Sequence, residues 1–387
     1  VNVDMATYKA EFLAHYYARR QRPREAYAFG LMPWWARLAA LAPSAANAAA
    51  QTPVLRDIGK ALSGMAPQRE IPLFAPRTFR QWFASRTGNA PRRAGTQRVL
   101  LWPDTWNNHF HPTTAQAAVQ VLEDAGFDVV IPKIQLCCGR PLYDYGMLDL
   151  AKTLLRGILD ELRAEIRAGV PVVGLEPSCV SVFRDEMNDL LGPDEDARRL
   201  QRQTYLLTEF LAAKAPDYRP PPLRRKALVH AHCHHKAILD RSAETRLFDA
   251  LHLEYDAPET GCCGMAGAFG FERKHYDVSL KVGERVLLPK VRSADDRTLI
   301  VADGFSCREQ IAQCTPRQAL HPAQVLKMAI DDRNAEHGQA REDSLPELRF
   351  MSDVRRERAA ASSRGIAAVA LLAAACGTGA FLALQRR

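Results

Sequence analysis

Two copies of the triplet Cys-Cys-Gly, at 137–139 and 262–264, constrain the fold of this chain more than any other feature. The residues around the triplets recur with an offset of about 125 to 129 positions. The aligned pairs are Asp104 with Cys233, Cys137 and Cys138 with Cys262 and Cys263, and Cys179 with Cys307. A recurrence of this length indicates an internal duplication, so we expect one folding unit to occur twice.

Short β-rich runs alternate with helix-length amphipathic segments in both copies, which is typical of a parallel sheet covered by helices. We expect strands near 98–103, 127–132, 170–175, 227–231, 253–257 and 297–302. The expected helices lie near 113–125, 146–168, 180–191, 237–251, 273–291 and 307–314. The cysteines come just after expected strands, where open parallel sheets bind ligands, so they should converge at one edge of each sheet.

The predicted fold class is therefore α/β, with two pseudo-repeated parallel-sheet, cysteine-rich domains. A helical N-terminal lead-in precedes them and a C-terminal hydrophobic helix follows. The expected boundaries are 1–95 for the lead-in, 96–192 for the first repeat, 193–225 for a connecting segment, 226–330 for the second repeat, 331–363 for a charged linker and 364–387 for a transmembrane tail.

The doublets favour a metal or cluster over disulfides, because adjacent Cα atoms lie about 3.8 Å apart, below the usual window for a bridged pair. Soft thiolates suit iron–sulfur clusters, zinc or Cu(I). Structural zinc usually uses compact CxxC knuckles, which this sequence lacks, so iron–sulfur comes first. The stretch "HAHCHHK" at 230–236 keeps zinc or a mixed Cys/His site open, and Cys314 and Cys376 are best explained as small buried hydrophobes.

The net charge of +8 comes from arginines scattered along the whole chain. Basic residues interleaved with aromatic residues in one stripe would indicate nucleic-acid binding, and no such stripe occurs, so we expect no nucleic-acid partner. Acidic partners or the inner face of a membrane explain the charge. No GxGxxG follows an expected strand, so we expect no FAD on this chain.

The motifs "CCGRPLYDYG", "EPSC", "HCHHK", "GCCGMAGAFG" and "ADGFSC" resemble the CCG-type cysteine-rich domain over residues 98–330. That domain occurs in the iron–sulfur subunit of glycolate oxidase, in lactate-utilisation proteins, in the cysteine-rich subunit of heterodisulfide reductase and in FAD-linked D-2-hydroxyacid dehydrogenases. The resemblance implies an oxidoreductase component: a flavin oxidises a 2-hydroxyacid such as glycolate, D-lactate or D-2-hydroxyglutarate, and this chain passes electrons toward a quinone or other acceptor.

The resemblance also implies the ligands of an iron–sulfur cluster of the 4Fe-4S type, namely Cys137, Cys138, Cys179, Cys233, Cys262, Cys263 and Cys307. The second repeat has the fuller set, and in the first Asp104 is an oxygen ligand. Val182 and Gln310 stand where heterodisulfide reductase has a further cysteine. Two alternatives stay open: a zinc-binding structural or docking module, and a thiol-based disulfide reductase subunit.

The opening "VNVDMATYKAEFLAHYY" is similar to the stretch that follows a ferredoxin-like cluster segment in the fused FAD-linked enzymes. We therefore expect that segment, and a flavin-binding domain or subunit, as partners outside this sequence.

The stretch from Ile366 to Leu384 carries no charge and as a helix would span about 28 Å, enough to cross a bilayer once. A buried or dimerising Ala-rich helix is the alternative. Arginines are denser before this stretch than after it, so the positive-inside rule places the cysteine domains at the cytoplasmic face of the membrane.

Overall fold

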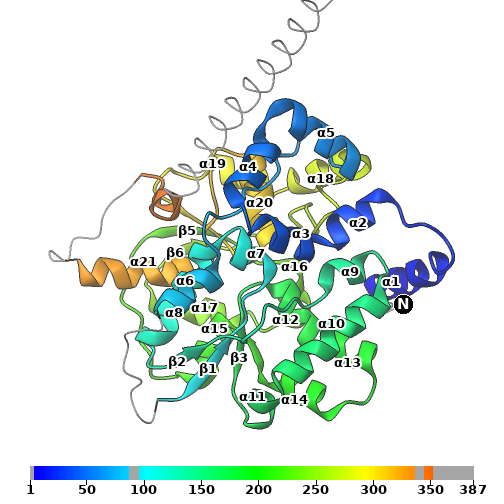
Figure 1. The fold of residues 1–387 in the computed structure, drawn as a ribbon. Coiled ribbons are helices and arrows are strands. Elements are labelled where there is room, and N and C mark those ends of the chain that lie inside the picture. The colour runs from blue at the N-terminus through cyan, green and yellow to red at the C-terminus, as the bar shows by residue number, and fades with distance from the viewer. Residues whose placement is uncertain (1–3, 87–95, 336–343, 352–387) are drawn as a thin grey trace, which may run out of the picture.

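The computed structural model describes residues 4–86, 96–335 and 344–351. Two parallel sheets, each with helices around it, make up most of this part of the chain (Figure 1). The duplication of a parallel α/β unit is thus confirmed. The expected transmembrane tail at 364–387, and most of the linker before it, lie outside the described residues. None of the helices within the described ranges combines the length and the apolar character that a membrane crossing requires.

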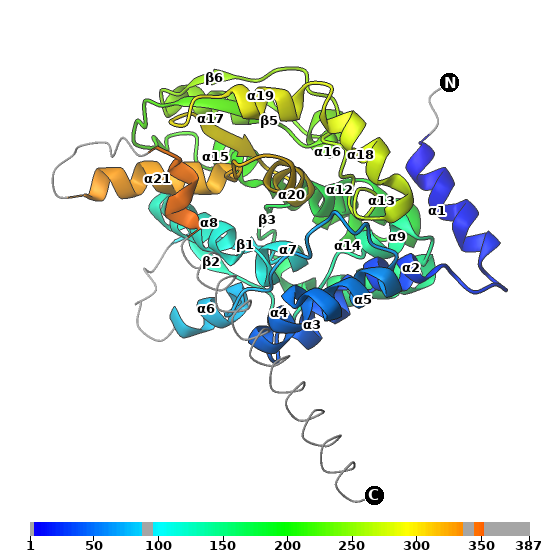
Figure 2. The same cartoon turned by 90° about the horizontal axis from the view of Figure 1, so that it is seen from above.

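The lead-in is helical, as its sequence predicts. Its helices are α1 (Met5–Tyr16), α2 (Arg24–Gly30), α3 (Met32–Ala39), α4 (Pro43–Gln51), α5 (Pro53–Ser63) and α6 (Phe79–Arg86). Asp4 caps α1 by accepting hydrogen bonds from the backbone N–H groups of Ala6 and Thr7. Helices α2 to α5 form one group that lies against the two repeats (Figure 2).

The first sheet has the strand order β2-β1-β3-β4, and all its neighbours are parallel. Its strands are β1 (Arg98–Leu101), β2 (Asp128–Val130), β3 (Val172–Gly174) and β4 (Thr204–Leu206). The central strand β3 is buried throughout, as expected for a parallel strand that is covered on both faces.

Helices α7 to α15 surround this sheet. They are α7 (Thr105–His109), α8 (Pro112–Asp124), α9 (Arg140–Asp144), α10 (Leu148–Glu161), α11 (Arg163–Arg167), α12 (Pro177–Arg184), α13 (Glu186–Leu191), α14 (Glu195–Gln203) and α15 (Leu207–Lys214). The segment 193–225, expected to be a connection, supplies α14, β4 and α15. The first folding unit therefore extends beyond residue 192.

The second sheet has the order β6-β5-β7, and Leu320 adds a parallel bridge to Val301 of β7 at the position that β4 takes in the first sheet. Its strands are β5 (Lys226–His230), β6 (Glu254–Asp256) and β7 (Leu299–Ala302). The helices are α16 (Cys233–Ile238), α17 (Ser242–Ala250), η1 (Arg273–His275), α18 (Tyr276–Gly283), α19 (Leu287–Ser293), α20 (Phe305–Cys314), α21 (Pro322–Asn334) and η2 (Pro346–Phe350).

Helices of the two repeats pack against one another across their interface. Helix α21 of the second repeat packs on α8 of the first, and α15 of the first packs on α17 of the second (Figures 1 and 2). A second reciprocal pair lies closer to the cysteines: α12 packs on α16, and the ring of Phe305 in α20 stacks on Trp106 in α7 at 4.6 Å between centroids. Each repeat therefore contributes helices that pack on helices of the other.

One apolar core runs through both repeats. Leu122 of α8 and Phe210 of α15 belong to the same buried cluster as Phe248 of α17 and Leu326 of α21. Val301 of β7 joins them at 1% exposure. Burial of such large side chains removes apolar surface from water, at roughly 25 cal/mol for each Å². The two repeats therefore share one hydrophobic core.

Candidate functional site

The functional side chains gather where the strands end. Helices α7, α12, α16 and α20 all begin within a few residues of the carboxyl end of a strand, as ligand-binding helices do in open parallel sheets. The packing of α12 on α16 and of α7 on α20 brings the first residues of these four helices to one region of the molecule.

The four cysteines of the second repeat form a continuous group. Cys233 begins α16, Cys262 and Cys263 lie in the loop after β6, and Cys307 lies in the first turn of α20. Side-chain contacts join Cys233 to Cys262, Cys262 to Cys263, and Cys263 to Cys307. Cysteines from three separate segments thus meet, as their positions after the strands predict.

These contacts lower the pKa of two of the four thiols and raise the pKa of the other two. Hydrogen bonds from Cys233 and then Cys263 lower the pKa of Cys262 to about 2. A hydrogen bond from Cys263, helped by neighbouring His230, holds the pKa of Cys307 well below its usual range. The pKa values of Cys233 and Cys263 are raised, first by those same contacts with Cys262 and then by burial. The lowered pKa values of Cys262 and Cys307 favour the thiolate at these two positions, and the thiolate is the form that binds metals.

The glycine after each doublet shapes the loop around the sulfur atoms. Gly264 has φ +90° and donates its N–H to Cys262 Sγ at 3.3 Å, and Met265 donates to Cys263 Sγ at 3.5 Å. In the first repeat Gly139, with φ +82°, donates to Cys137 Sγ at 3.5 Å. A positive φ is the conformation that glycine adopts at low cost. The third residue of the triplet therefore turns a backbone donor toward the sulfur.

His230 is a fifth donor beside the second group. Its ring nitrogen and the sulfurs of Cys263 and Cys307 all lie within 4.8 Å of one another, and all three residues are buried. The other ring nitrogen of His230 is 2.6 Å from Thr260 Oγ1, which orients the ring. Such a hydrogen bond is a frequent support for a histidine ligand.

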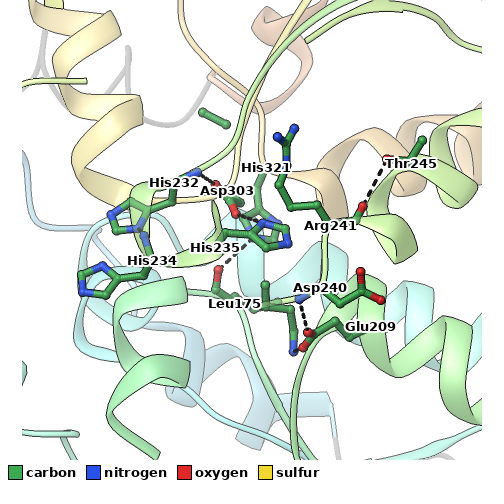
Figure 3. A network of polar contacts seen from close by, with 12 residues as sticks. Leu175, Glu209, His232, His234, His235, Asp240, Arg241, Thr245, Asp303 and His321 are labelled. Atoms are coloured by element: carbon green, nitrogen blue, oxygen red, sulfur yellow. Dashed lines mark hydrogen bonds and ion pairs between the residues drawn. The ribbon is translucent and has the colours of Figure 1, made fainter. Parts of the chain in front are cut away.

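The remaining histidines of "HAHCHHK" point in different directions (Figure 3). The rings of His232 and His234 stack at 5.1 Å with 9° between their planes. His235 turns the opposite way, and its Nδ1 lies 2.7 Å from Asp303 Oδ2. The other oxygen of the same carboxylate, Asp303 Oδ1, accepts the His232 N–H at 2.8 Å. Asp303 thus fixes the segment that carries Cys233.

The first repeat assembles three cysteines in the same way, but its thiols stay protonated. Cys138 Sγ lies 3.0 Å from Cys179 Sγ, and Cys137 contacts Cys138. The contact with Cys138 and burial raise the pKa of Cys137. The contact with Cys138 lowers the pKa of Cys179, but burial together with the nearby Asp104, Cys137 and Glu176 raises it to about 12. A metal would have to displace protons from all of these sulfurs, so the first repeat is the weaker site.

The expected alignment of Asp104 with Cys233 is wrong by one residue. Asp104 is the N-cap of α7, as His232 is the N-cap of α16. Asp104 Oδ1 accepts hydrogen bonds from the N–H groups of Trp106 and Asn107, and Oδ2 accepts one from Asn107 Nδ2 at 2.8 Å. Both oxygens are engaged, so the structure corrects the oxygen-ligand role that the sequence suggested for Asp104.

Thr105 is the true counterpart of Cys233. It begins α7 as Cys233 begins α16, and its side chain contacts Cys137 as Cys233 contacts Cys262. The first repeat therefore has a hydroxyl where the second has a thiol. A sequence signal for this register exists: Asp104 is followed by a helix-length segment, and aspartate is a favoured N-cap.

Sequence reasoning missed two charged residues that join the repeats. Glu176 is buried at the start of α12, and its Oε2 accepts the backbone N–H of Phe305 at 2.7 Å. Arg140, directly after the first triplet, donates from Nη2 to His234 Nε2 at 2.9 Å and forms an ion pair with Glu186. The sequence did contain a signal for Arg140, because a charged residue directly after two buried cysteines needs an oppositely charged or hydrogen-bonding partner.

Comparison with known proteins identifies the repeated unit. The family model of the cysteine-rich domain, CCG, matches residues 104–184 and 227–312. Both matched segments contain the cysteine groups described above, so the expected resemblance is confirmed.

Three relatives illustrate the range of similar proteins. A subunit of the anaerobic glycerol-3-phosphate dehydrogenase of Escherichia coli (strain K12) is 26% identical over 294 residues, covering 75% of this chain and 72% of the relative. D-2-hydroxyglutarate dehydrogenase of Pseudomonas putida is 28% identical over 84% of this chain, which corresponds to 32% of the relative. Lactate utilization protein A of Bacillus velezensis is 29% identical over 54% of this chain and 87% of the relative. Two of these relatives are named as a dehydrogenase or as a subunit of one, and the third is named for lactate utilization.

Proposed function

Since this chain carries the CCG cysteine-rich domain twice, we propose that it is the iron–sulfur, electron-transferring component of a flavin-linked dehydrogenase. The single observation that carries the proposal is the group formed by Cys233, Cys262, Cys263 and Cys307. A set of four converging cysteines is the usual ligand set of a cubane cluster.

The donor chemistry of the second repeat fits such a cluster. Four thiol groups are available, the pKa values of Cys262 and Cys307 are lowered, and N–H groups of the glycine loop donate to the sulfurs. When bound there, an iron–sulfur cluster supplies one-electron chemistry. The chain's own part is to keep Cys263 and Cys307 away from water and to hold the loop through Gly264, both of which tune the potential of a bound cluster.

The relatives suggest the class of substrate that the complete enzyme oxidises. Their names refer to glycerol-3-phosphate, D-2-hydroxyglutarate and lactate, which all have a hydroxyl group on a secondary carbon. We propose that this chain serves the oxidation of a small 2-hydroxyacid or related secondary alcohol. The flavin that takes the hydride belongs to a partner domain or subunit.

Anaerobic purification of the full chain, followed by iron, sulfide and zinc analysis and electron paramagnetic resonance, tests the proposal. We expect iron with acid-labile sulfide and a signal that appears on reduction with dithionite. Zinc without iron would overturn the electron-transfer role and favour the zinc-binding alternative, for which His230 beside Cys263 and Cys307 provides a suitable Cys/His set.

The disulfide-reductase alternative draws on a different observation. Cys138 and Cys179 lie with their sulfurs 3.0 Å apart in the first repeat, close enough for thiol–disulfide exchange after a small movement. A disulfide-reducing activity that disappears in Cys179→Ser but persists after iron removal would favour it. Loss of activity with iron removal alone would favour the cluster.

We also propose that the stretch 364–387, which lies outside the described residues, anchors the chain to the cytoplasmic face of a membrane. Its support is the uncharged run of apolar residues and the arginines that precede it. The full chain should pellet with membranes and resist carbonate extraction, and a chain ending near Asp353 should stay in the supernatant with its iron. Recovery of the full chain in the supernatant would overturn the anchor.

A further inference from the structure

A second group of metal-ligating side chains lies in the second repeat, and it contains no sulfur. His235 belongs to α16, Glu244 is the third residue of α17, and Asp303 directly follows β7. One ligand atom of each lies within 4.8 Å of the other two, and all three residues are buried. Nitrogen and oxygen ligands bind an ion such as Zn²⁺ at about 2.0–2.2 Å, so two ligands of one ion lie at most about 4.4 Å apart. The three side chains therefore need only a small movement to meet at one ion.

Two ligand atoms of this group are left without a partner in the part of the chain that the structure describes. His235 Nδ1 lies 2.7 Å from Asp303 Oδ2 (Figure 3). The second ring nitrogen of His235, Nε2, is buried and has no hydrogen-bond partner there. The Glu244 side chain, at 3% exposure, is affected by burial and by charges, without a hydrogen bond or an ion pair from a described residue. Buried polar groups are normally paired, so these two indicate a ligand.

The charges of the group favour a cation. Burial, and then the charge of Asp303, raise the pKa of Glu244 to about 7. Arg241 acts in the opposite direction, but it forms no ion pair with Glu244 among the described residues. A divalent ion between the two carboxylates and a neutral imidazole would leave the buried site without net charge, which lowers the cost of burying the carboxylates. Binding of the ion displaces the proton that His235 and Asp303 share.

The first repeat shows that the duplicated unit folds without charged groups at these positions. The counterparts follow from the pairing of the cysteine positions and from the third residues of α8 and α17. They are buried and uncharged: Asn107 for His235, Leu175 for Asp303 and Thr114 for Glu244. Since the fold of the unit does not require the charges, stabilisation of that fold does not explain why the second repeat has them.

We propose that His235, Glu244 and Asp303 bind one divalent first-row transition metal ion, of the Zn²⁺ or Mn²⁺ kind, at a site separate from the cysteine groups. Imidazole suits zinc, carboxylates suit manganese, and neither set of donors has the softness of thiolates. The proposal does not depend on the proposed electron-transfer function.

The position of the ion gives it a structural consequence. Asp303 precedes Cys307 by four residues, and its Oδ1 accepts the N–H of His232, the residue before Cys233. The ion would therefore connect the two segments that carry Cys233 and Cys307 with helix α17, which has no cysteine of its own. Supporting contacts of this kind hold the first ligands of a metal centre in position.

Glu244→Gln is the variant that tests the site, because it removes the charge and keeps the length of the side chain. Glu254→Gln makes the same change in the same repeat at 79% side-chain exposure and is the matched control. Cys263→Ser is the reciprocal control, since it removes a sulfur and leaves the proposed site intact. The full chains are purified anaerobically, incubated with Mn²⁺ and freed of excess ion by gel filtration. Iron, zinc and manganese are then counted per chain.

We expect Glu244→Gln to hold one ion of zinc or manganese fewer than the unmodified chain, with unchanged iron. Glu254→Gln should match the unmodified chain, and Cys263→Ser should lose iron but keep the ion. Equal zinc plus manganese in the unmodified chain and Glu244→Gln, or loss of the ion in Cys263→Ser, would overturn the proposal.

X-ray absorption of the ion in the unmodified chain decides the question if Glu244→Gln fails to fold, which its iron content reports. Nitrogen and oxygen neighbours at about 2.0–2.2 Å would support the site, and sulfur at about 2.3 Å would assign the ion to the cysteines and overturn it. Iron and sulfide contents test the proposed function separately, so the two failures are distinguishable.

Discussion

Replacement of the glycine in the second triplet by alanine gives the sharpest test of the loop geometry. Gly264 has φ +90°, and a Cβ added there would lie 2.1 Å from the carbonyl oxygen of Ser279 and 3.1 Å from its carbonyl carbon. Ser279 belongs to the buried part of α18, so this oxygen cannot rotate away as a side chain could. Gly264→Ala therefore requires the loop or the helix to move.

Gly139 of the first triplet is the matched control. Its φ is +82°, but an added Cβ would lie 3.5 Å from the nearest atoms of Ala151, which is an ordinary contact. A positive φ costs alanine roughly 1–2 kcal/mol, partly offset by the loss of about 0.4–1 kcal/mol of entropy in the unfolded chain. Gly139→Ala should therefore cost about 1 kcal/mol. Gly264→Ala adds an overlap of the kind that typically costs about 1–3 kcal/mol, for a total of roughly 2–4 kcal/mol.

The assay is urea unfolding of the full chain under anaerobic, reducing conditions, followed by tryptophan fluorescence, with bound iron measured on the same samples. We expect a larger decrease in the unfolding midpoint for Gly264→Ala than for Gly139→Ala. We also expect a loss of iron in Gly264→Ala, because the forced movement of the loop would displace the N–H that donates to Cys262 Sγ. Equal midpoints and equal iron for the two variants would refute the reasoning from the overlap with Ser279.

Three further predictions concern the two cysteine groups and the segment beside them. Thr105→Cys should raise the iron bound per chain, because it gives the first repeat the thiol that it lacks; unchanged iron would contradict the pairing of Thr105 with Cys233. Cys263→Ser should lose more iron than Cys138→Ser, whereas equal losses would indicate one joint site or two equal sites. Burial lowers the pKa of His235, but Asp303 outweighs it and raises that pKa to about 9, above the unfolded value of about 6.5. The resulting stabilisation, on the order of 3 kcal/mol, is complete below pH 6.5 and is lost as pH rises through 9. Asp303→Asn should remove this decline in the free energy of unfolding, and a variant that retains it would exclude the pair as its source.

Much of the fold follows from local pattern. Buried strands such as β3 and β7 are continuous apolar runs, and the cysteines mark their ends, so the duplicated sheets were predictable. Strand β4 was not, because "TYL" is short and lies between two helices, and its pairing with β3 depends on distant residues. Local sequence carries little information on such non-local pairing.

The candidate site was predictable in composition but not in arrangement. Motif spacing is enough to group Cys262 and Cys263 with Cys307, because each follows a strand of one sheet. A cavity of about 530 Å³ is lined by residues of the two repeats and of the lead-in, so it depends on how these parts pack. Phe29 and Phe305 both line it, and no periodicity in the segments around them reveals this. The one-residue error at Asp104 has a similar cause, since an N-cap and a ligand can occupy neighbouring positions in a loop.

The reciprocal packing of α8 with α21 and of α15 with α17 is the arrangement of a two-fold symmetric pair. A homodimer of the single unit would have the same arrangement. A homodimer must carry the same residue at both equivalent positions. Two copies in one chain are free of that constraint, and here position 105 is threonine while position 233 is cysteine. A single chain with two copies of the unit can therefore place two unlike cysteine groups in the wall of one cavity, which a homodimer cannot do.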